Sequence, residues 1–238
     1  MSTPRLLLLP GLDGTGELFE PFERAMGAAS PLTVVRYSSP ELTRYVECLA
    51  AVRDQLPRKE PFVLVGESFS GPVAVSIAAD NPPGLAGLVL VGSFVSSPRR
   101  ALTWLSSFID VMPTHDAPAW ASDALLFGRW ATADLRSRVK EAMARVSPRA
   151  VRERLREIAR VDVSTELARV GVPILYLQAS HDRLVPKSAA DTVARLAPHA
   201  KVVEIEGPHL LLQCAPKRCA EAIREFLAER GGAVAGPT

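Results

Sequence analysis

The chain has 238 residues, of which 47% are hydrophobic and 23% are charged, and its formal net charge is +2. A chain of this length buries one sizeable core and is common for a single α/β domain, and the composition excludes a disordered protein. Nucleic-acid-binding proteins usually carry a stronger and clustered basic excess, so we expect no nucleic-acid partner.

The three cysteines, Cys48, Cys214 and Cys219, lack C-x-x-C spacing, which predicts neither a disulfide framework nor a zinc site. The four histidines show no i, i+4 pairing, so we expect no metal. Residues 6–9 are too few for the apolar part of a signal peptide, and no apolar run approaches the roughly 20 residues needed to cross a bilayer. The sequence therefore predicts a soluble, cytoplasmic protein without a membrane span.

Short apolar runs, often β-branched, alternate with helical patterns along most of the chain. Strands are expected at residues 5–9, 32–37, 62–65, 88–91, 173–179 and 201–205, and helices at 41–56, from 71 to about 81, at 191–196 and at 219–230. This alternation favours an α/β fold, with a mainly parallel sheet of about six strands and helices on both faces.

A glycine-rich loop, LPGLDGTGELF, occupies residues 9–19. Its glycines do not match G-x-G-x-x-G, and no lysine stands where a P-loop needs one, which argues against a dinucleotide or phosphate site. The loop is better explained as an oxyanion loop, in which a backbone N–H faces a substrate carbonyl oxygen. A simple turn is the alternative.

Residues 62–71, FVLVGESFSG, have the pattern of a nucleophile elbow, in which a strand, a sharp turn and a helix present a serine. Ser68 is the predicted nucleophile, and the backbone N–H groups of Leu12 and Phe69 are the predicted oxyanion donors. Ser70 stands where the second glycine of G-x-S-x-G is expected, and Gly71 follows one residue later. Because a G-x-S alone is more often structural than catalytic, the interpretation depends on partners elsewhere.

Between residues 96 and 170 we find no convincing strand but several helical patterns, a stretch far longer than a usual connection. We predict a helical cap (lid) over 96–170, inserted into a core of residues 1–95 and 171–238. The insert holds several large aromatic side chains, which would line a pocket for an apolar acyl group or pack the cap onto the body. They are Trp104, Phe108, Trp120, Phe127 and Trp130.

Residues 136–160 carry nine arginines and lysines against three glutamates. This basic run would suit an acidic acyl carrier docking on the cap, although such a run is usually the solvated face of an amphipathic helix.

Three residues of the right types follow expected strands in the order Ser68, Asp182, His209. The carboxyl ends of parallel strands meet at one edge of a sheet, so these side chains should converge there. His209 would act as general base, and Asp182 would orient its imidazole. Each has a structural alternative: Asp182 as a turn former and His209 as a packed histidine. His181 is the neighbouring rival of Asp182, but an imidazole cannot serve as the acid.

The segments GESFSG, SHDRLVP, GPHLLLQCAP and LPGLDGTG resemble those of the α/β-hydrolase superfamily over nearly the whole chain except the insert. The cap position, and the sequence from VDVSTEL to HDRLVP, are similar to the pimeloyl-carrier-protein methyl ester esterase group of biotin synthesis. The resemblance implies an eight-stranded fold with a Ser-Asp-His triad and no cofactor. Since residues 5–9 correspond to the third family strand, we expect the first two family strands to be absent and six to remain. Pro10-Gly11 stands in place of the frequent His-Gly of the oxyanion loop.

We therefore expect a serine hydrolase that cleaves small-molecule carboxylic esters through an acyl-enzyme. Two alternatives stay open. One is a hydrolase of carrier-bound or coenzyme-bound acyl esters or thioesters, and the other is a ligand-binding receptor with vestigial activity.

Overall fold

The computed structural model describes residues 3–28, 30–37, 42–98 and 123–233. Six parallel strands form one sheet in the order β2-β1-β3-β4-β5-β6. The strands are β1 (Arg5–Leu9), β2 (Leu32–Val34), β3 (Phe62–Glu67), β4 (Leu85–Val91), β5 (Ile174–Ala179) and β6 (Lys201–Ile205). The predicted α/β fold with a six-stranded parallel sheet is confirmed.

The second strand is shorter than predicted, because it ends at Val34 instead of Tyr37. The Val35 N–H still donates to the Leu8 carbonyl, at 2.9 Å. Two residues later the Tyr37 N–H donates to the Gly14 carbonyl of the glycine-rich loop, at 2.7 Å. The chain therefore leaves the sheet and packs against the loop that follows β1.

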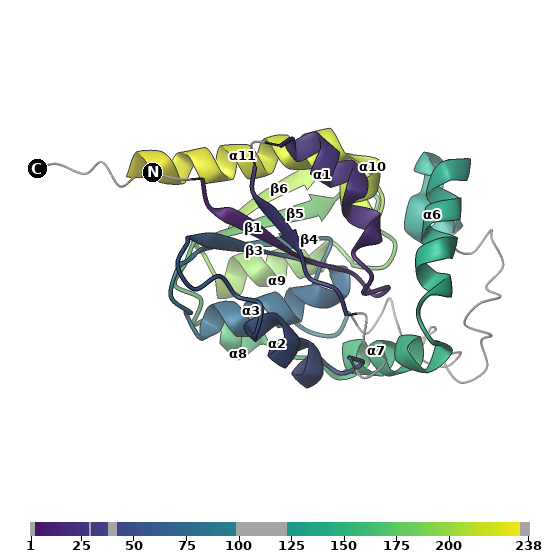
Figure 1. Cartoon of the computed structure of the whole chain (residues 1–238), viewed down its shortest axis with the longest axis horizontal. Helices are drawn as coiled ribbons and strands as arrows, with labels where there is room; N and C mark the ends of the chain where they lie inside the picture. Colours follow the sequence, from purple (N-terminus) through teal and green to yellow (C-terminus); the bar gives the residue numbers. More distant parts are fainter. Residues whose placement is uncertain (1–2, 29, 38–41, 99–122, 234–238) are drawn as a thin grey trace, which may run out of the picture.

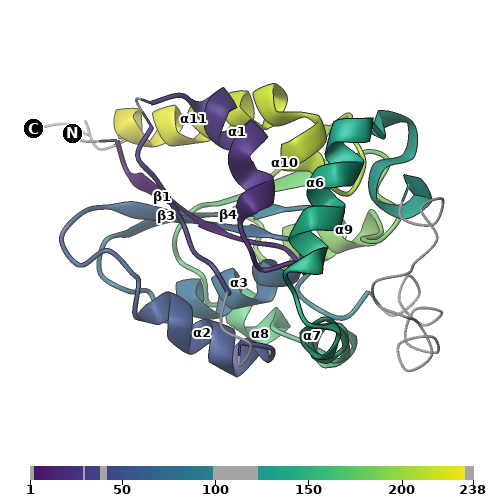
Figure 2. The same ribbon diagram turned by 45° about the vertical axis from the view of Figure 1, so that its right-hand side comes forward.

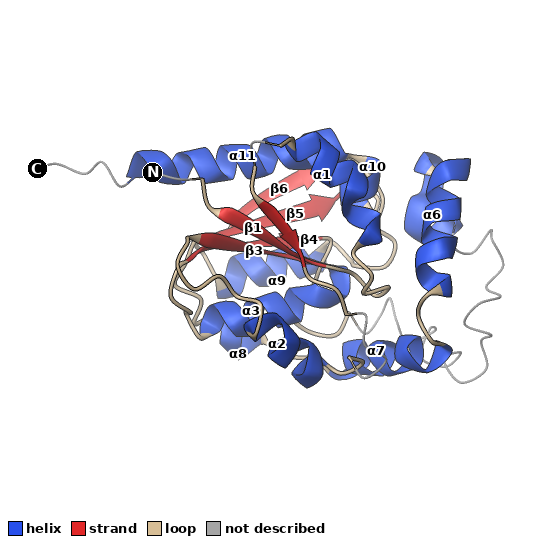
Figure 3. Ribbon diagram, viewed as in Figure 1, coloured by secondary structure: helices blue, strands red, loops and turns tan. Residues whose placement is uncertain are grey.

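Helices cover both faces of the sheet, as Figures 1 and 3 show. One face carries α1 (Glu20–Met26), α10 (Leu211–Cys214) and α11 (Pro216–Ala233), and the other carries α2 (Tyr45–Arg53), α3 (Gly71–Ala79), α8 (Ser164–Leu167) and α9 (Ser188–Leu196). Successive strand residues point to opposite faces. Leu7 and Leu9 thus enter the core under α2 and α3, while Leu6 and Leu8 enter the core under α1 and α11. This double burial explains why the strands read as continuous apolar runs.

Residues 123–160 of the long insert are mainly helical and lie beyond the carboxyl ends of the strands (Figures 1 and 2). They comprise η3 (Asp123–Phe127), η4 (Gly128–Trp130), α6 (Ala133–Ala144) and α7 (Pro148–Arg160). Helix α8, which also falls within 96–170, packs in the core under the sheet instead. Ser147 caps α7, since its hydroxyl accepts from the Ala150 N–H at 3.1 Å. The division into a core and a cap stays a prediction.

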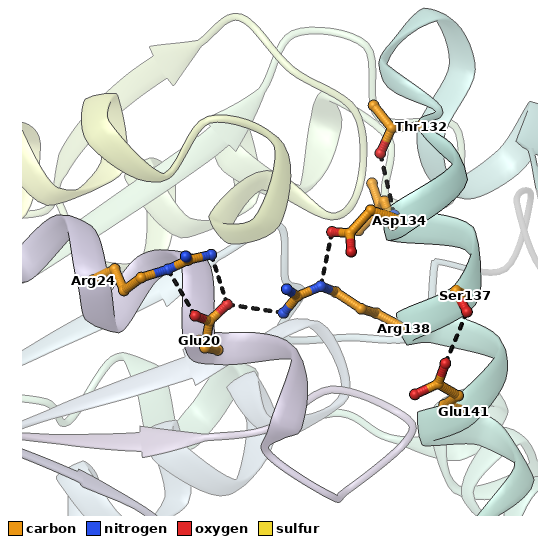
Figure 4. Close-up of polar contacts among 8 residues, drawn as sticks. Glu20, Arg24, Thr132, Asp134, Ser137, Arg138 and Glu141 are labelled. Atoms are coloured by element: carbon orange, nitrogen blue, oxygen red, sulfur yellow. Dashed lines mark hydrogen bonds and ion pairs between the residues drawn. The ribbon is translucent and has the colours of Figure 1, made fainter.

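Polar contacts join α6 to the body of the molecule (Figure 4). Arg138 of α6 donates to Glu20 of α1 at 2.8 Å, and Glu20 also holds Arg24 on its own helix. Arg145 pairs with Glu17 in the turn η1 (Glu17–Phe19). These side chains are substantially exposed, so each pair contributes little to stability.

None of the described helices is long and apolar enough to cross a membrane.

Candidate active site

The turn after β3 presents Ser68 at the carboxyl edge of the sheet. Its φ is 46°, a left-handed conformation that is uncommon for any residue but glycine. A 3-10 turn over Ser68–Ser70 then leads directly into α3. The Ser93 hydroxyl donates to the Ser68 carbonyl at 2.7 Å and helps to hold this backbone. The strand, turn and helix predicted around Ser68 are all present.

The departure from G-x-S-x-G has a structural explanation. Ser70 is fully buried; its hydroxyl donates to the Pro10 carbonyl and lies 2.8 Å from the Tyr37 hydroxyl. The serine therefore links the elbow to the glycine-rich loop. At Gly71, in contrast, an added Cβ would lie 1.7 Å from the Ser93 hydroxyl oxygen, so only glycine fits there.

Three side chains that are far apart in the sequence meet beside this turn. The Ser68 Oγ lies 2.9 Å from His209 Nε2, and His209 Nδ1 lies 2.8 Å from Asp182 Oδ2. Asp182 follows β5 and His209 follows β6, so the order of the strands brings them to one edge. The structure brings together all three residues that the sequence singled out.

Asp182 also forms a turn, which was the structural alternative for this residue. Its Oδ1 accepts the N–H groups of Leu184 and Val185, each at 2.8 Å, and so it forms the turn after β5. Its Oδ2 remains for His209. His181 is exposed, with its Nδ1 2.7 Å from the Ser180 hydroxyl and its ring against Trp130. The rival side chain makes contacts outside the Ser68–His209–Asp182 group.

The surroundings of His209 favour its protonated form. Burial by itself would lower the pKa of the imidazole, but the Asp182 carboxylate acts against this through its charge and its hydrogen bond. The nearby Glu67 adds a second negative charge, and the net effect is a pKa above the ordinary value for histidine. His209 is thus suited to accept a proton from Ser68.

The glycine-rich loop lies directly beside the nucleophile. A Cβ built on Gly11 would lie 3.9 Å from Ser68 Cβ. Leu12 is half-buried against the side of α7, and Phe69 is fully buried, with its ring stacked on Tyr45 at 4.7 Å. Within the described residues, neither the Leu12 N–H nor the Phe69 N–H has a hydrogen-bond partner. Among the described residues, these two amides donate no hydrogen bond to the protein, so each could donate one to a substrate oxygen.

Glu67 is a notable member of this region that the sequence reasoning missed. It is 4% exposed and accepts a hydrogen bond from the Gln213 side chain of α10, at 3.0 Å. Burial raises its pKa to about 7; the repulsion of Asp13 acts in the same direction, and the Gln213 hydrogen bond acts against it. Glu67 ends an otherwise apolar buried strand, and a carboxylate at such a position is the sequence feature that could have indicated a buried acid beside Ser68.

This buried acid predicts a pH-dependent stability. Because the pKa of Glu67 in the folded protein lies above the ordinary glutamate value of about 4.5, its contribution to folding stability is fully present below that value and is lost as the pH rises through about 7. The variant Glu67→Gln cannot ionise and escapes this loss. Its melting temperature should therefore exceed that of the wild type by more at pH 8.5 than at pH 5. The corresponding gain in the free energy of unfolding should reach up to about 3 kcal/mol at the higher pH. Thermal melts at both values, with Glu225→Gln on the exposed face of α11 as control, test this; an equal difference at both pH values would contradict it.

A cavity of about 240 Å³ lies beside Asp182. It is lined by Gly128, Arg129, Trp130, His181, Asp182 and Arg183. Trp130 thus lies at this cavity and Phe127 is buried, while Trp104, Phe108 and Trp120 are outside the described residues. Whether the aromatic residues line an acyl pocket stays a prediction.

In the described part of the chain, no cluster of three or more His, Cys, Asp or Glu side chains could hold a metal ion.

A parallel sheet that delivers a serine on a strained turn after one strand, beside a histidine and an aspartate at later strand ends, defines an α/β-hydrolase. Residues 35–209 match the hydrolase family described as "Serine aminopeptidase, S33". The chain belongs to this family.

Curated relatives agree with this class. The chain is 26% identical to the pimeloyl-[acyl-carrier protein] methyl ester esterase of Xanthomonas axonopodis pv. citri, over 94% of this chain and 95% of that protein. It is 29% identical to the pyrrolizixenacetamide deacetylase of Xenorhabdus hominickii, over 71% of this chain and 66% of the relative. It is 33% identical to phytyl ester synthase 1 of Arabidopsis thaliana, over 46% of this chain but only 16% of that protein's length.

Solved structures show the same fold. The bromoperoxidase from Bacillus anthracis superimposes with a TM-score of 0.81 over 94% of this chain and 92% of that chain, at 18% identity. A lipase-esterase related protein from Clostridium acetobutylicum gives a TM-score of 0.80 over 94% and 95%, at 15% identity. The resemblance to the α/β-hydrolases that the sequence indicated is confirmed.

Proposed function

We propose that the protein is a carboxylic-ester hydrolase that acts through an acyl-enzyme on Ser68. The observation that carries this is the continuous chain of contacts from Ser68 Oγ to His209 at 2.9 Å and on to Asp182 at 2.8 Å. Nucleophile, base and orienting acid are therefore within hydrogen-bonding reach before any substrate binds.

In the proposed first step, Ser68 attacks the ester carbonyl while His209 Nε2 takes the hydroxyl proton. The amides of Leu12 and Phe69 would donate to the oxyanion of the tetrahedral intermediate. His209 then gives its proton to the departing alcohol, which leaves an acyl group on Ser68. In the second half, His209 activates a water that releases the acid. Asp182 keeps the Nδ1 proton in place throughout and stabilises the imidazolium.

The named relatives support acyl transfer as the reaction class, since one is called a methyl ester esterase and another a deacetylase. An ester and an amide pass through the same kind of tetrahedral intermediate, and an ester has the better leaving group. We therefore place esters first, and leave the length of the acyl chain to a substrate panel.

The test combines a fluorophosphonate probe with such a panel. The probe should add one adduct to the intact mass, at the peptide that holds Ser68, and p-nitrophenyl esters graded by chain length should be hydrolysed with a definite optimum. A protein that stays unlabelled, or that labels but turns over no ester, would instead be the ligand-binding receptor that the sequence also allowed.

A carrier-bound acyl substrate is the second candidate, and it rests on the arginine-rich run. The structure uses much of that run internally: Arg136, Arg138, Arg145 and Arg156 pair with carboxylates, and Arg154 is buried. Among the described residues, the basic side chains of this run without such a pair are Lys140, Arg149, Arg152 and Arg160. Docking of an acidic carrier there predicts a kcat/KM that falls steeply with salt for an acyl-carrier substrate but not for a small neutral ester.

A further inference from the structure

Helix α7 contributes a buried cation that none of the steps above uses. Arg154 is 1% exposed and is among the largest fully buried side chains described. Burial lowers the pKa of its guanidinium, and the nearby Asp13 carboxylate acts against this. A guanidinium still carries its charge at neutral pH, so taking it out of water is costly unless all of its N–H groups are bonded.

The backbone of two loops provides those bonds. Nη1 donates to the carbonyls of Leu12 at 2.8 Å and Asp13 at 3.0 Å. Nη2 donates to those of Leu42 at 2.9 Å and Tyr37 at 3.3 Å, and Nε donates to Leu42 at 3.3 Å. A guanidinium has five N–H groups, and these contacts use all five. Arg154 therefore ties the glycine-rich loop to the segment that follows β2.

These bonds fix the backbone on one side of Leu12. A peptide unit is planar, so holding its carbonyl also sets the direction of the N–H on its other side. The plane after Leu12 is held by Arg154. The plane before Leu12 carries its N–H, and the Gly11 carbonyl of that plane accepts from the Gly14 N–H at 3.1 Å. Because the peptide planes on both sides of Leu12 are held by hydrogen bonds, the direction of the Leu12 N–H is restricted.

Arg154 also contacts the other predicted oxyanion donor. Its guanidinium carbon lies 5.9 Å from the centre of the Phe69 ring and 5.8 Å from that of Tyr37. Gly14 makes room for it, because a Cβ at that position would lie 2.6 Å from Nη1, and its φ of 69° suits glycine alone. One side chain of α7 thus touches both residues whose amides face the reaction in the proposed mechanism.

We propose that Arg154 is the positioning residue for the oxyanion donors: by holding the Leu12 carbonyl and packing on the Phe69 ring, helix α7 restricts how far the two amides can turn. The inference rests on the proposed function, since it concerns the same site. It makes transition-state stabilisation depend on a helix that supplies none of the Ser68, His209 and Asp182 side chains.

The test compares Arg154→Met, which keeps length and loses the donors, with Arg154→Lys, which keeps the charge and offers three donors instead of five. For Arg154→Met we expect kcat per active site to fall about tenfold to a hundredfold, because one misdirected oxyanion donor typically costs a hundredfold or more when lost entirely. KM should change by less than about threefold, because an interaction made only in the transition state is lost. Arg154→Lys should fall between this variant and the wild type. Active sites are counted by the fluorophosphonate mass shift at saturation.

A trifluoromethyl ketone inhibitor separates positioning from general destabilisation, because its adduct on serine carries the oxyanion. Its Ki for each variant should rise in proportion to the loss in kcat/KM. Arg218→Met, an exposed position on α11, should leave kcat, KM and Ki unchanged. If either Arg154 variant keeps a wild-type kcat per labelled site and a wild-type Ki, with only a lower melting temperature, Arg154 is a structural residue and the proposal is wrong. Wild-type protein that neither labels nor hydrolyses esters would instead overturn the proposed function.

Discussion

Ser68→Ala is expected to lower kcat for p-nitrophenyl butyrate by about 10⁴-fold or more while leaving the protein folded. The loss is large because the other members of such a site cannot act without the nucleophile; only binding and oxyanion contacts remain. The fold should persist because the Ser68 Oγ has its hydrogen bond to His209 at the edge of the sheet, and removing a hydroxyl there leaves the core intact.

The measurement is steady-state kinetics together with a thermal melt, and the melting temperature should stay within a few degrees of the wild type. Ser76→Ala is the matched control, since Ser76 lies in the helix α3 that the elbow begins and takes no part in the proposed site. Turnover by Ser68→Ala within tenfold of the wild type would show that another residue is the nucleophile. A residual rate that fluorophosphonate treatment of the variant abolishes would point the same way.

The sheet could be predicted because each strand is buried on both faces and so carries a continuous apolar run bounded by turns. The helix expected at 41–56 is shorter, from Tyr45 to Arg53. At its start, the Glu47 carboxylate accepts the N–H groups of Thr43 and Arg44, which holds these residues outside the helix. Apolar periodicity marks the face of a helix well, but such a local contact decides where the helix begins.

The three central site residues could also be predicted, because parallel topology sends successive strand ends to one edge. The residues that support them could not. Among the arginines of residues 136–160, Arg154 differs from the others only in its place along the helix, and its residue type alone makes it part of one basic run. Its position between Val151 and Ile158, on the buried stripe of α7, was the available signal. Its four acceptor carbonyls lie more than 110 residues away in the sequence, so only the folded chain shows what it binds.

Asp182→Asn is expected to lower kcat by about 10³-fold to 10⁴-fold, although the side chain keeps its size. In the wild type, Oδ2 lies 2.8 Å from His209 Nδ1 and Oδ1 accepts the Leu184 and Val185 N–H groups. An amide has one oxygen, and the two backbone donors will keep it. The NH₂ group then faces His209 Nδ1, which must become an acceptor. The ring proton moves to Nε2, and the imidazole can no longer take the Ser68 proton.

The pH profile gives this prediction a second readout. In the wild type the kcat/KM should rise with pH through the raised pKa of His209, because only the neutral ring is a base. Removing the carboxylate removes the attraction that raises this pKa, so the acidic limb of the remaining activity should move to lower pH. Asp191→Asn on α9, where the side chain is exposed, should change neither rate nor profile. If Asp182→Asn kept activity within tenfold and left the acidic limb in place, the carboxylate would be forming the turn after β5 and nothing more.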